Sequence, residues 1–372
     1  MKKSLLAASI ALSVGAMSLA GCADAPGTST TPTTAASSAT TTSAPMTAFK
    51  ACMVSDSGGF DDKSFNQTSY AGLEKAKADL GIETGEVESK DVKDFSTNVQ
   101  SMIDAKCNII VTTGFLLSDA TVAAAKAHPE IKFAIVDDNP ASAAGLTNFK
   151  PLVFNTAESS FLAGYLAAGT SKTGKVGTFG GMKIPTVTIF MDGFAQGVEY
   201  YNKQKSASIK VLGWDAAKQD GQFVPEPKPF ENVAGGQTTA KNLMSQGADI
   251  IFPVAGPAGI GALQAATASN GKAKAIWVDQ DGCVSASTYC KVILTSVLKG
   301  METAVFEAIK AAKDDTFSSD PFVGTLENGG TGIAPFHEFD GTVSAEMKAD
   351  LDKIKADIIS GTIKITSASQ PK

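Results

Sequence analysis

Short apolar runs alternate with helical patterns along most of this 372-residue chain. The runs are continuous in apolar residues, which is typical of parallel strands buried on both faces. Polar or glycine-rich turns follow the runs, and apolar residues at helical spacing come next. The predicted strands are 51–54, 108–113, 132–137, 149–154, 175–180, 210–214, 249–254, 274–279 and 291–295. The predicted helices cover roughly 70–80, 121–127, 159–172, 189–203, 238–246, 258–269, 299–313 and 345–359.

Strands that alternate with helices favour doubly wound parallel sheets, and the alternation starts again near residue 175. We therefore expect an α/β fold of two similar, Rossmann-like lobes with a cleft between them. The last strand and helix are expected to cross back to the first lobe. On this interpretation lobe 1 is 49–157 plus about 283–316, and lobe 2 is 158–282 plus about 317–372.

Residues 1–21 have the pattern of a signal peptide. Lys2 and Lys3 precede an apolar stretch, 5–19, that is short for a membrane span. Small residues then lead to Cys22, as in lipoprotein signals, so we expect cleavage before Cys22 and lipid on its sulfur. The alternative is an ordinary secretory signal in which Cys22 is incidental.

The segment that follows, up to residue 48, consists mainly of Ala, Thr, Ser and Pro, and its single charge is Asp24. Without large aliphatic side chains it cannot offset the entropy of ordering, so 22–48 is predicted to be a disordered tether behind the lipidated cysteine. No later apolar run reaches membrane-spanning length. We expect the lipid alone to hold the protein on the extracytoplasmic face of the cell membrane.

Charge and cysteine content indicate which partners, disulfide bonds and metals to expect. The formal net charge is −6 and no basic cluster stands out, which argues against nucleic acid. With Cys22 lipidated, four cysteines remain for an oxidising compartment, and they allow three pairings. We favour Cys283–Cys290, which are close in sequence, and Cys52–Cys107, which lie in neighbouring strand–helix units. Ligand spacing and a count of only two histidines argue against zinc, so no metal is expected.

Polar residues at the predicted strand ends are candidates for a binding site. Asp follows a strand at Asp56, Asp137 and Asp279, and Gly does so at 114, 180 and 256. Ligands of open α/β sheets bind outside the carboxyl ends of the strands. Carboxylates and backbone N–H groups there would hold a polar ligand. The alternative is that these are ordinary turn and helix-capping residues.

Aromatic residues gather near the same ends, at 60, 65, 115 and 194. Rings stack on flat ligands, and carboxylates accept vicinal hydroxyls, so the combination suits a base with a ribose. Lys299 would donate to a sugar oxygen. Core packing of the rings and a solvated Lys299 are the alternatives.

Signals for catalysis are weak. His128 and His337 lie in polar contexts, and no nucleophile or nucleotide-phosphate motif is present. Adjacent carboxylates such as Asp61 and Asp62 point in different directions, which disfavours a glycosidase pair. We therefore expect that the protein is not an enzyme and that it binds no cofactor.

The stretch from Asp56 to Gln67 reads Asp-Ser-Gly-Gly-Phe-Asp-Asp-Lys-Ser-Phe-Asn-Gln and carries the strongest family signal.

 It closely resembles the opening signature of the basic membrane protein (Bmp) family, PnrA-like substrate-binding lipoproteins of ABC transporters. The resemblance continues through 133–137, 158–168, 177–181, 191–197, 276–282 and 294–299, so it spans nearly the whole chain beyond the tether.

This resemblance implies a type I periplasmic-binding-protein fold, with two lobes, a hinge and a ligand in the cleft. It implies that Phe65 and Phe194 stack on a base, one from each lobe. The other implied contacts are Asp56, Asn66 and Asp137 around the base edge, and Gly256, Asp279 and Lys299 at the ribose.

We therefore expect a lipid-anchored monomer that binds a nucleoside, with a purine favoured, and delivers it to an ABC permease. Two alternatives stay open. One is a sensor or surface lipoprotein for a sugar or another small solute, and the other is a nucleoside hydrolase that uses the strand-end carboxylates.

Overall fold

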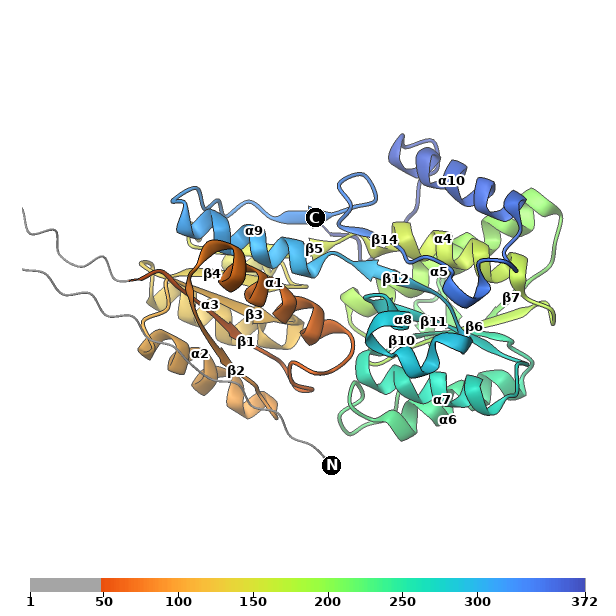
Figure 1. The fold of residues 1–372 in the computed structure, drawn as a ribbon, viewed down its shortest axis with the longest axis horizontal. Helices are drawn as coiled ribbons and strands as arrows, with labels where there is room; N and C mark the ends of the chain where they lie inside the picture. The colour runs from red at the N-terminus through yellow and green to blue at the C-terminus, as the bar shows by residue number, and fades with distance from the viewer. Residues whose placement is uncertain (1–47, 372) are drawn as a thin grey trace, which may run out of the picture. The chain divides into compact units, whose positions relative to one another are not determined.

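The structure, a computed structural model, describes residues 48–371. They form two six-stranded sheets with helices on both faces of each, which confirms the expected α/β architecture (Figure 1). The expected signal peptide, the lipidated Cys22 and nearly all of the expected tether lie outside the described residues. Within 48–371, no helix is long and apolar enough to cross a membrane.

The sheet of lobe 1 has the strand order β13-β5-β4-β3-β1-β2, and all its pairs are parallel. Its strands are β1 (Lys50–Val54), β2 (Glu83–Val87), β3 (Ile109–Thr113), β4 (Lys132–Val136), β5 (Phe149–Phe154) and β13 (Phe322–Gly324). Its helices are α1 (Phe65–Leu80) and α9 (Met301–Lys313) on one face and α2 (Phe95–Asp104) and α3 (Ser118–Ala127) on the other. The central strands are buried from both sides, as their continuous apolar runs predict.

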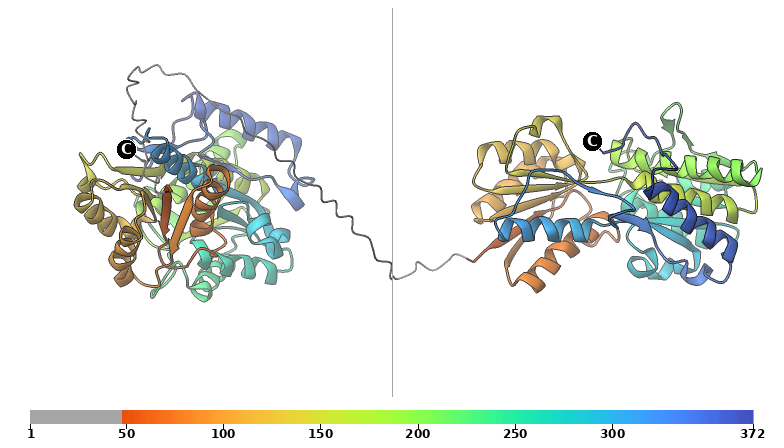
Figure 2. Two further views of the ribbon diagram at one scale, coloured as in Figure 1. Left: turned by 60° about the vertical axis from the view of Figure 1, so that its left-hand side comes forward. Right: turned by 90° about the horizontal axis from the view of Figure 1, so that it is seen from above.

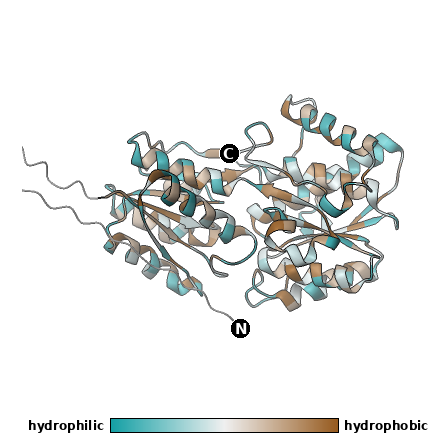
Figure 3. Ribbon diagram, viewed as in Figure 1, coloured by the Kyte–Doolittle hydropathy of each residue, from teal (hydrophilic) through white to brown (hydrophobic). Residues whose placement is uncertain are grey.

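The sheet of lobe 2 has the order β14-β12-β11-β10-β6-β7, and only β14 is antiparallel to its neighbour. Its strands are β6 (Lys175–Gly180), β7 (Lys210–Leu212), β10 (Ile250–Val254), β11 (Lys274–Asp279), β12 (Ile293–Lys299) and β14 (Thr331–Ile333). The helices on one face are α4 (Thr156–Thr170), α5 (Pro185–Lys205) and α10 (Ala345–Ile359), and those on the other are α6 (Val233–Ser245) and α7 (Ile260–Ala268). Two short elements complete the lobe, a β8–β9 pair (Trp214–Asp215 with Asp220–Gly221) and α8 (Gly282–Ser285). Figure 3 shows hydrophobic residues gathered in the central strands of both sheets.

The chain passes between the sheets after β5, after β12, and between β13 and β14. The sequence-based lobe boundaries near 282 and 317 differ from this arrangement. Residues 293–299 form β12, which pairs with β11 in the second sheet, so the crossing comes at Lys299 and the return to lobe 1 begins with α9. The reason is that β12 pairs directly with β11 in parallel, after the connecting segment 280–292 that contains α8. β13 then adds to the first sheet after the expected boundary at 317.

Besides the short elements α8 and β9, the pattern did not predict four elements of the two lobes. β2 and α2 lie between the first two predicted strands, and β13 and β14 lie in a segment expected to be irregular. β2 reads Glu-Thr-Gly-Glu-Val and has no fully buried residue, because it is an edge strand. β13 and β14 have three residues each, too few to show a period.

Both expected disulfides are present in the structure. Cys52 in β1 bonds to Cys107 at the start of the neighbouring β3 unit, with 5.9 Å between the Cα atoms. Cys283 bonds to Cys290 across the short loop after β11, with 4.6 Å between the Cα atoms. The first bond fixes the strand that leads to Asp56, and the second constrains the loop after Asp279.

The C-terminal segment returns to the junction of the two lobes (Figure 2). The Ser369 hydroxyl lies 2.8 Å from that of Thr188 in α5, and Gln196 in the same helix donates to the carbonyl of Thr366. Residues 366–371 are thereby held along the start of α5, on the side of the cleft.

Candidate functional site

The carboxyl ends of parallel strands from both sheets border one cavity of about 640 Å³. In open α/β sheets the strand-to-helix loops converge at this edge, which makes it the ordinary ligand site. Seven of the eight ligand-binding residues expected from the sequence line it: Asp56, Phe65, Asn66, Asp137, Gly256, Asp279 and Lys299. The fold therefore brings together in one cavity residues that are more than 200 positions apart in the sequence, such as Asp56 and Asp279.

A carboxyl–amide pair forms one end of the cavity. Asp56 follows β1, and its Oδ1 accepts a hydrogen bond of 2.7 Å from Nδ2 of Asn66 in the first turn of α1. Asn66 Oδ1 is buried and has no partner among the described residues. A ligand edge that donates a hydrogen bond would satisfy it.

Asp62 positions this pair, a role that sequence reasoning missed. Its carboxylate accepts backbone N–H groups of Ser64 and Asn66, each at 2.9 Å, and of Gln67 at 3.0 Å. These bonds cap the start of α1 and satisfy N–H groups that have no partner within the helix. The capping fixes the turn from which Phe65 and Asn66 reach the cavity.

Burial shifts the pKa of both carboxyl groups upward. It raises the pKa of Asp56 to about 8, and the nearby carboxylates of Asp62 and Glu231 raise it further, while the hydrogen bond from Asn66 opposes the change. Burial likewise raises the pKa of Asp62 to about 6. Asp56 is therefore mostly protonated at neutral pH and is able to donate as well as accept a hydrogen bond.

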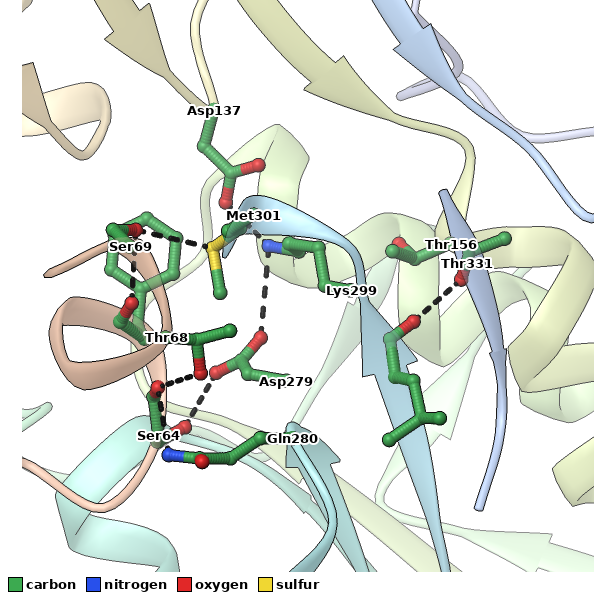
Figure 4. Close-up of polar contacts among 12 residues, drawn as sticks. Ser64, Thr68, Ser69, Asp137, Thr156, Asp279, Gln280, Lys299, Met301 and Thr331 are labelled. Carbon is green, nitrogen blue, oxygen red and sulfur yellow. Dashed lines mark hydrogen bonds and ion pairs between the residues drawn. The ribbon is translucent and has the colours of Figure 1, made fainter. Parts of the chain in front are cut away.

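Lys299 lies at the other end of the cavity, between carboxylates of the two lobes (Figure 4). Its Nζ is 2.5 Å from Oδ2 of Asp137, after β4, and 3.8 Å from Oδ1 of Asp279, at the end of β11. All three side chains are almost fully buried. Burial raises the pKa of Asp137, and the charge of Lys299 opposes that shift. The group is a compact set of one donor and two acceptors for hydroxyl groups.

Direct contacts between the lobes lie beside this group. Ser64 of lobe 1 donates its hydroxyl to Asp279 of lobe 2. The indole N–H of Trp277 lies 3.3 Å from the carbonyl oxygen of Lys63, and the side-chain amide of Gln280 lies 3.4 Å from that of Ser64. The start of α1 therefore touches the end of β11 across the cleft (Figure 4).

Four rings line the cavity, two from each lobe: Phe65, Phe115, Phe190 and Phe230. Phe190 is 1% exposed and lies 5.1 Å from the Lys299 ammonium, measured to the ring centroid. Phe65 lies 5.0 Å from the same nitrogen. Phe65, Phe115 and Phe230 keep part of their surface exposed, so their faces are available to a ligand.

The prediction for Phe194 is wrong. Its side chain is fully buried in the core of lobe 2 and packs on Phe252 with 5.2 Å between the ring centroids. Phe190 lies one helical turn earlier on α5, nearer the cleft, and lines the cavity instead. Phe60, another aromatic residue singled out in the sequence, stacks on Tyr70 and does not line the cavity. Phe230 was missed because it follows a proline-rich segment without a period.

Two glycines shape the cavity wall. Gly114 has φ +110°, and a Cβ there would meet Oδ2 of Asp56 at 2.7 Å. Gly256 has φ +52° and open space where a Cβ would lie. The first glycine makes room for the carboxyl group of Asp56, and the second leaves its backbone accessible to a ligand.

The part of the chain that the structure describes does not offer a metal site. Among residues 48–371, one group has ligand atoms close enough to hold an ion: Asp281, Cys283 and His337. Cys283 is bonded to Cys290, so its sulfur is not a thiolate ligand. His337 pairs with Asp281 at 2.7 Å instead.

Two α/β lobes with crossing segments, and a cavity lined by strand ends of both, define a solute-binding protein of the type I periplasmic-binding fold. The chain belongs to the Bmp family of PnrA-like ABC transporter substrate-binding proteins, whose family model matches residues 49–369. Members of this family are substrate-binding proteins rather than enzymes, in agreement with the sequence analysis. Membership implies a permease partner and a small ligand.

Individual relatives support this placement over the length of the chain. The chain is 31% identical over 386 residues to the ABC transporter nucleoside-binding protein BmpA of Lactococcus lactis, covering 99% of this chain and 100% of that protein. It is 30% identical over 314 residues to basic membrane protein A of Borreliella burgdorferi, covering 83% and 86%. Among solved structures, a solute-binding protein of an ABC transporter system from Aeropyrum pernix K1 has a TM-score of 0.75 at 23% identity, covering 86% of this chain and 93% of that chain. That last likeness concerns the fold alone.

Proposed function

We propose that this protein binds a nucleoside, with a purine favoured, outside the cell and delivers it to an ABC permease. The observation that carries the proposal is the division of one cavity into two chemical ends. A carboxyl–amide pair forms one end, the buried group around Lys299 forms the other, and aromatic rings line the cavity. The relative named as a nucleoside-binding protein adds support at 31% identity.

The base would lie between Phe65 of lobe 1 and Phe230 of lobe 2. Both rings keep exposed surface, whereas Phe190 is already covered. Stacking on each ring would contribute about 1–3 kcal/mol, by analogy with bases on protein aromatics. The base edge would meet Asp56 and Asn66, which offer both donors and acceptors in the protonation state that burial favours.

The ribose would lie at the opposite end. Asp279 would accept its vicinal hydroxyls, and Lys299 would donate to a sugar oxygen. Asp137 would orient and balance the charge of Lys299, to which it is joined at 2.5 Å. Gly256, with no side chain in the way, would present its backbone to the sugar.

Capture would require the lobes to open and close around the three crossing segments, as in other hinged binding proteins. Opening would break the contacts of Ser64 with Asp279 and of Lys63 with Trp277. A nucleoside that touches both lobes favours the closed state, because it has more contacts there. Closure would also exclude water from the hydrogen bonds of the site.

The alternative ligand is a sugar without a base. A sugar would use the group around Lys299 but would leave the exposed faces of Phe65 and Phe230 and the polar pair at Asp56 without a role. The same cavity makes a nucleoside hydrolase the weaker proposal, because the family consists of substrate-binding proteins.

We also propose that the protein is attached to the cell membrane. Lipid on Cys22 and a tether over 22–48 would hold the binding domain at the extracytoplasmic face of the membrane as a monomer. No nucleic acid partner is proposed, in line with the net charge of −6.

Isothermal titration of the purified protein tests the ligand, with adenosine, guanosine, inosine and uridine beside free bases, D-ribose and D-glucose. Purine nucleosides should bind at least tenfold more tightly than either sugar. Phe65→Ala and Phe230→Ala should each weaken nucleoside binding about tenfold or more. Phe60→Ala is the matched control, because that ring stacks on Tyr70 outside the cavity, and it should leave the affinity unchanged. Equal binding of D-ribose, or full affinity in both cavity variants, would overturn the proposal.

A further inference from the structure

A second cavity, of about 770 Å³, lies next to the first at its Lys299 end. The two cavities share Phe115, Asp137, Thr186 and Lys299 as lining residues. The Asp137–Lys299 ion pair therefore forms part of the wall between them. We call this second cavity the hinge chamber, because Phe154 and Thr156 of the first crossing segment also line it.

The C-terminal segment closes the hinge chamber on the outside. Residues 368–371 line it, together with Pro185 and Ile189 at the start of α5. Hydrogen bonds hold this segment in place: Ser367 donates to Asp192 at 2.5 Å, and the hydroxyls of Ser369 and Thr188 lie 2.8 Å apart. Anchored chain therefore forms part of the wall of the chamber.

The charges that line the hinge chamber favour a cation or a hydrogen-bond donor. They are Asp137, Asp138 and Lys299, and Lys299 already pairs with Asp137. Asp138 is 9% exposed, and its carboxyl group accepts hydrogen bonds from the side chain of Ser118 and the backbone N–H of Asn139. Its Oδ2 nevertheless has no hydrogen-bond partner among the described residues. Buried polar atoms ordinarily have partners, so this oxygen, on a residue that lines the chamber, is a position for a ligand group.

A second polar group in the same wall also lacks a partner. Thr156, the first residue of α4, is fully buried, and its hydroxyl oxygen makes no hydrogen bond among residues 48–371. It follows a different strand from Asp138, since β4 leads to Asp138 and the neighbouring β5 leads to Thr156. The chamber therefore has unsatisfied polar atoms on two elements, while the shared ion pair is satisfied.

We propose that the hinge chamber is a subsite for a hydrogen-bond-donating or cationic substituent on the sugar of the ligand. This inference rests on the proposed function, because it requires the sugar to lie at Lys299. With the vicinal hydroxyls on Asp279, the 5′ carbon is the part of a ribose that is free to extend past the Asp137–Lys299 pair. The ligand class is then nucleosides with an amino group at the 5′ carbon, besides the parent nucleosides.

The test compares adenosine, 5′-deoxyadenosine and 5′-amino-5′-deoxyadenosine by isothermal titration on the full protein. The amino compound should bind at least as tightly as adenosine and at least tenfold more tightly than the 5′-deoxy compound. Asp138→Asn should weaken binding of the amino compound about tenfold and leave adenosine within twofold. Asp119→Asn is the matched control, because Asp119 is exposed, lies near Asp138 and does not line the chamber.

A second variant tests the chamber without changing Asp138. Ser369→Lys places a positive charge in the C-terminal wall and should weaken the amino compound about tenfold while leaving adenosine unchanged. Tighter binding of adenosine than of the amino compound by tenfold or more, or equal losses for both ligands in Asp138→Asn, would overturn the subsite while leaving the proposed function in place. Binding of none of the three compounds, and of no other nucleoside, would instead overturn the proposed function and the subsite with it.

Discussion

Lys299 and Asp137 form an ion pair between the two lobes, with 2.5 Å between Nζ and Oδ2. Lys299 ends β12 in the second sheet, and Asp137 follows β4 in the first. Both side chains are more than nine-tenths buried, and Asp279 lies 3.8 Å from the same ammonium group. The pair therefore links the sheets at the hinge and also forms the polar end of the ligand cavity.

Replacing Lys299 by Met should destabilise the protein by about 3–5 kcal/mol, because it leaves buried carboxylates without their cation. Nucleoside binding should be lost as well. Urea unfolding measures the first effect and isothermal titration the second. The matched control is Lys348→Met, which removes a partly exposed lysine that pairs with Asp340 and should cost about 0–1 kcal/mol. Equal unfolding midpoints for the two variants would contradict the structural role of Lys299.

Stability should fall as the pH rises from about 4 to about 8, through the contribution of Asp56. Burial raises the pKa of this group from the ordinary 3.8 to about 8, so within that window the folded state holds a proton that the unfolded chain has released. The state that binds more protons becomes less stable relative to the other state as the pH rises. The contribution of Asp56 to the free energy of unfolding is therefore present below pH 4 and lost as the pH passes 8. Asp62, with a pKa raised to about 6, adds the same trend up to that pH.

Urea unfolding at several pH values, on the wild type and on Asp56→Asn, isolates this contribution. The difference in free energy of unfolding between the two proteins should shift in favour of the variant between pH 5 and pH 8. Parallel curves across that range would show that the Asp56 carboxyl group does not titrate as its burial requires.

Gly114→Ala should abolish nucleoside binding and destabilise the fold. The new Cβ would meet Oδ2 of Asp56 at 2.7 Å, and the φ of +110° strains any residue with a side chain, at a cost of about 1–3 kcal/mol. Gly145→Ala is a matched control, since Gly145 also has positive φ, at +84°, but has no atom within 4 Å of the new Cβ. Isothermal titration should find the binding defect in Gly114→Ala alone, and a similar defect in both variants would rule out the contact with Asp56 as its cause.

The sequence predicts most of this fold because buried parallel strands have a direct signal, the continuous apolar run. It predicts most of the site because parallel strands of one sheet end at one edge, which brings Asp56 and Asp137 together in lobe 1. The same logic places Asp279 at the facing edge of lobe 2. Elements that are exposed or short, such as β2 and β13, leave no such signal in the pattern of hydrophobic residues.

The sequence does not determine which phenylalanine of α5 faces the site. Phe190 and Phe194 are four residues apart and lie on one face of α5, so a helical period alone cannot say which ring reaches the cleft. The answer depends on where α5 begins, at Pro185, four residues before the predicted start. Lys299 shows the same dependence, because it ends a strand in the structure and was expected to begin a helix.

Ligand binding should change the fluorescence of Trp277 but not that of Trp214, the second of the two tryptophans. The indole N–H of Trp277 meets the carbonyl of Lys63 in the other lobe at 3.3 Å, so its surroundings change when the lobes open. Trp214 donates at 2.9 Å to Asp192 within lobe 2, a contact that moves with its own lobe. Titration with a nucleoside should therefore give a fluorescence change in the wild type and in Trp214→Phe, and none in Trp277→Phe. A change that is absent in Trp214→Phe would mean that the surroundings of Trp277 stay the same during binding, and that the lobes do not open and close at this contact.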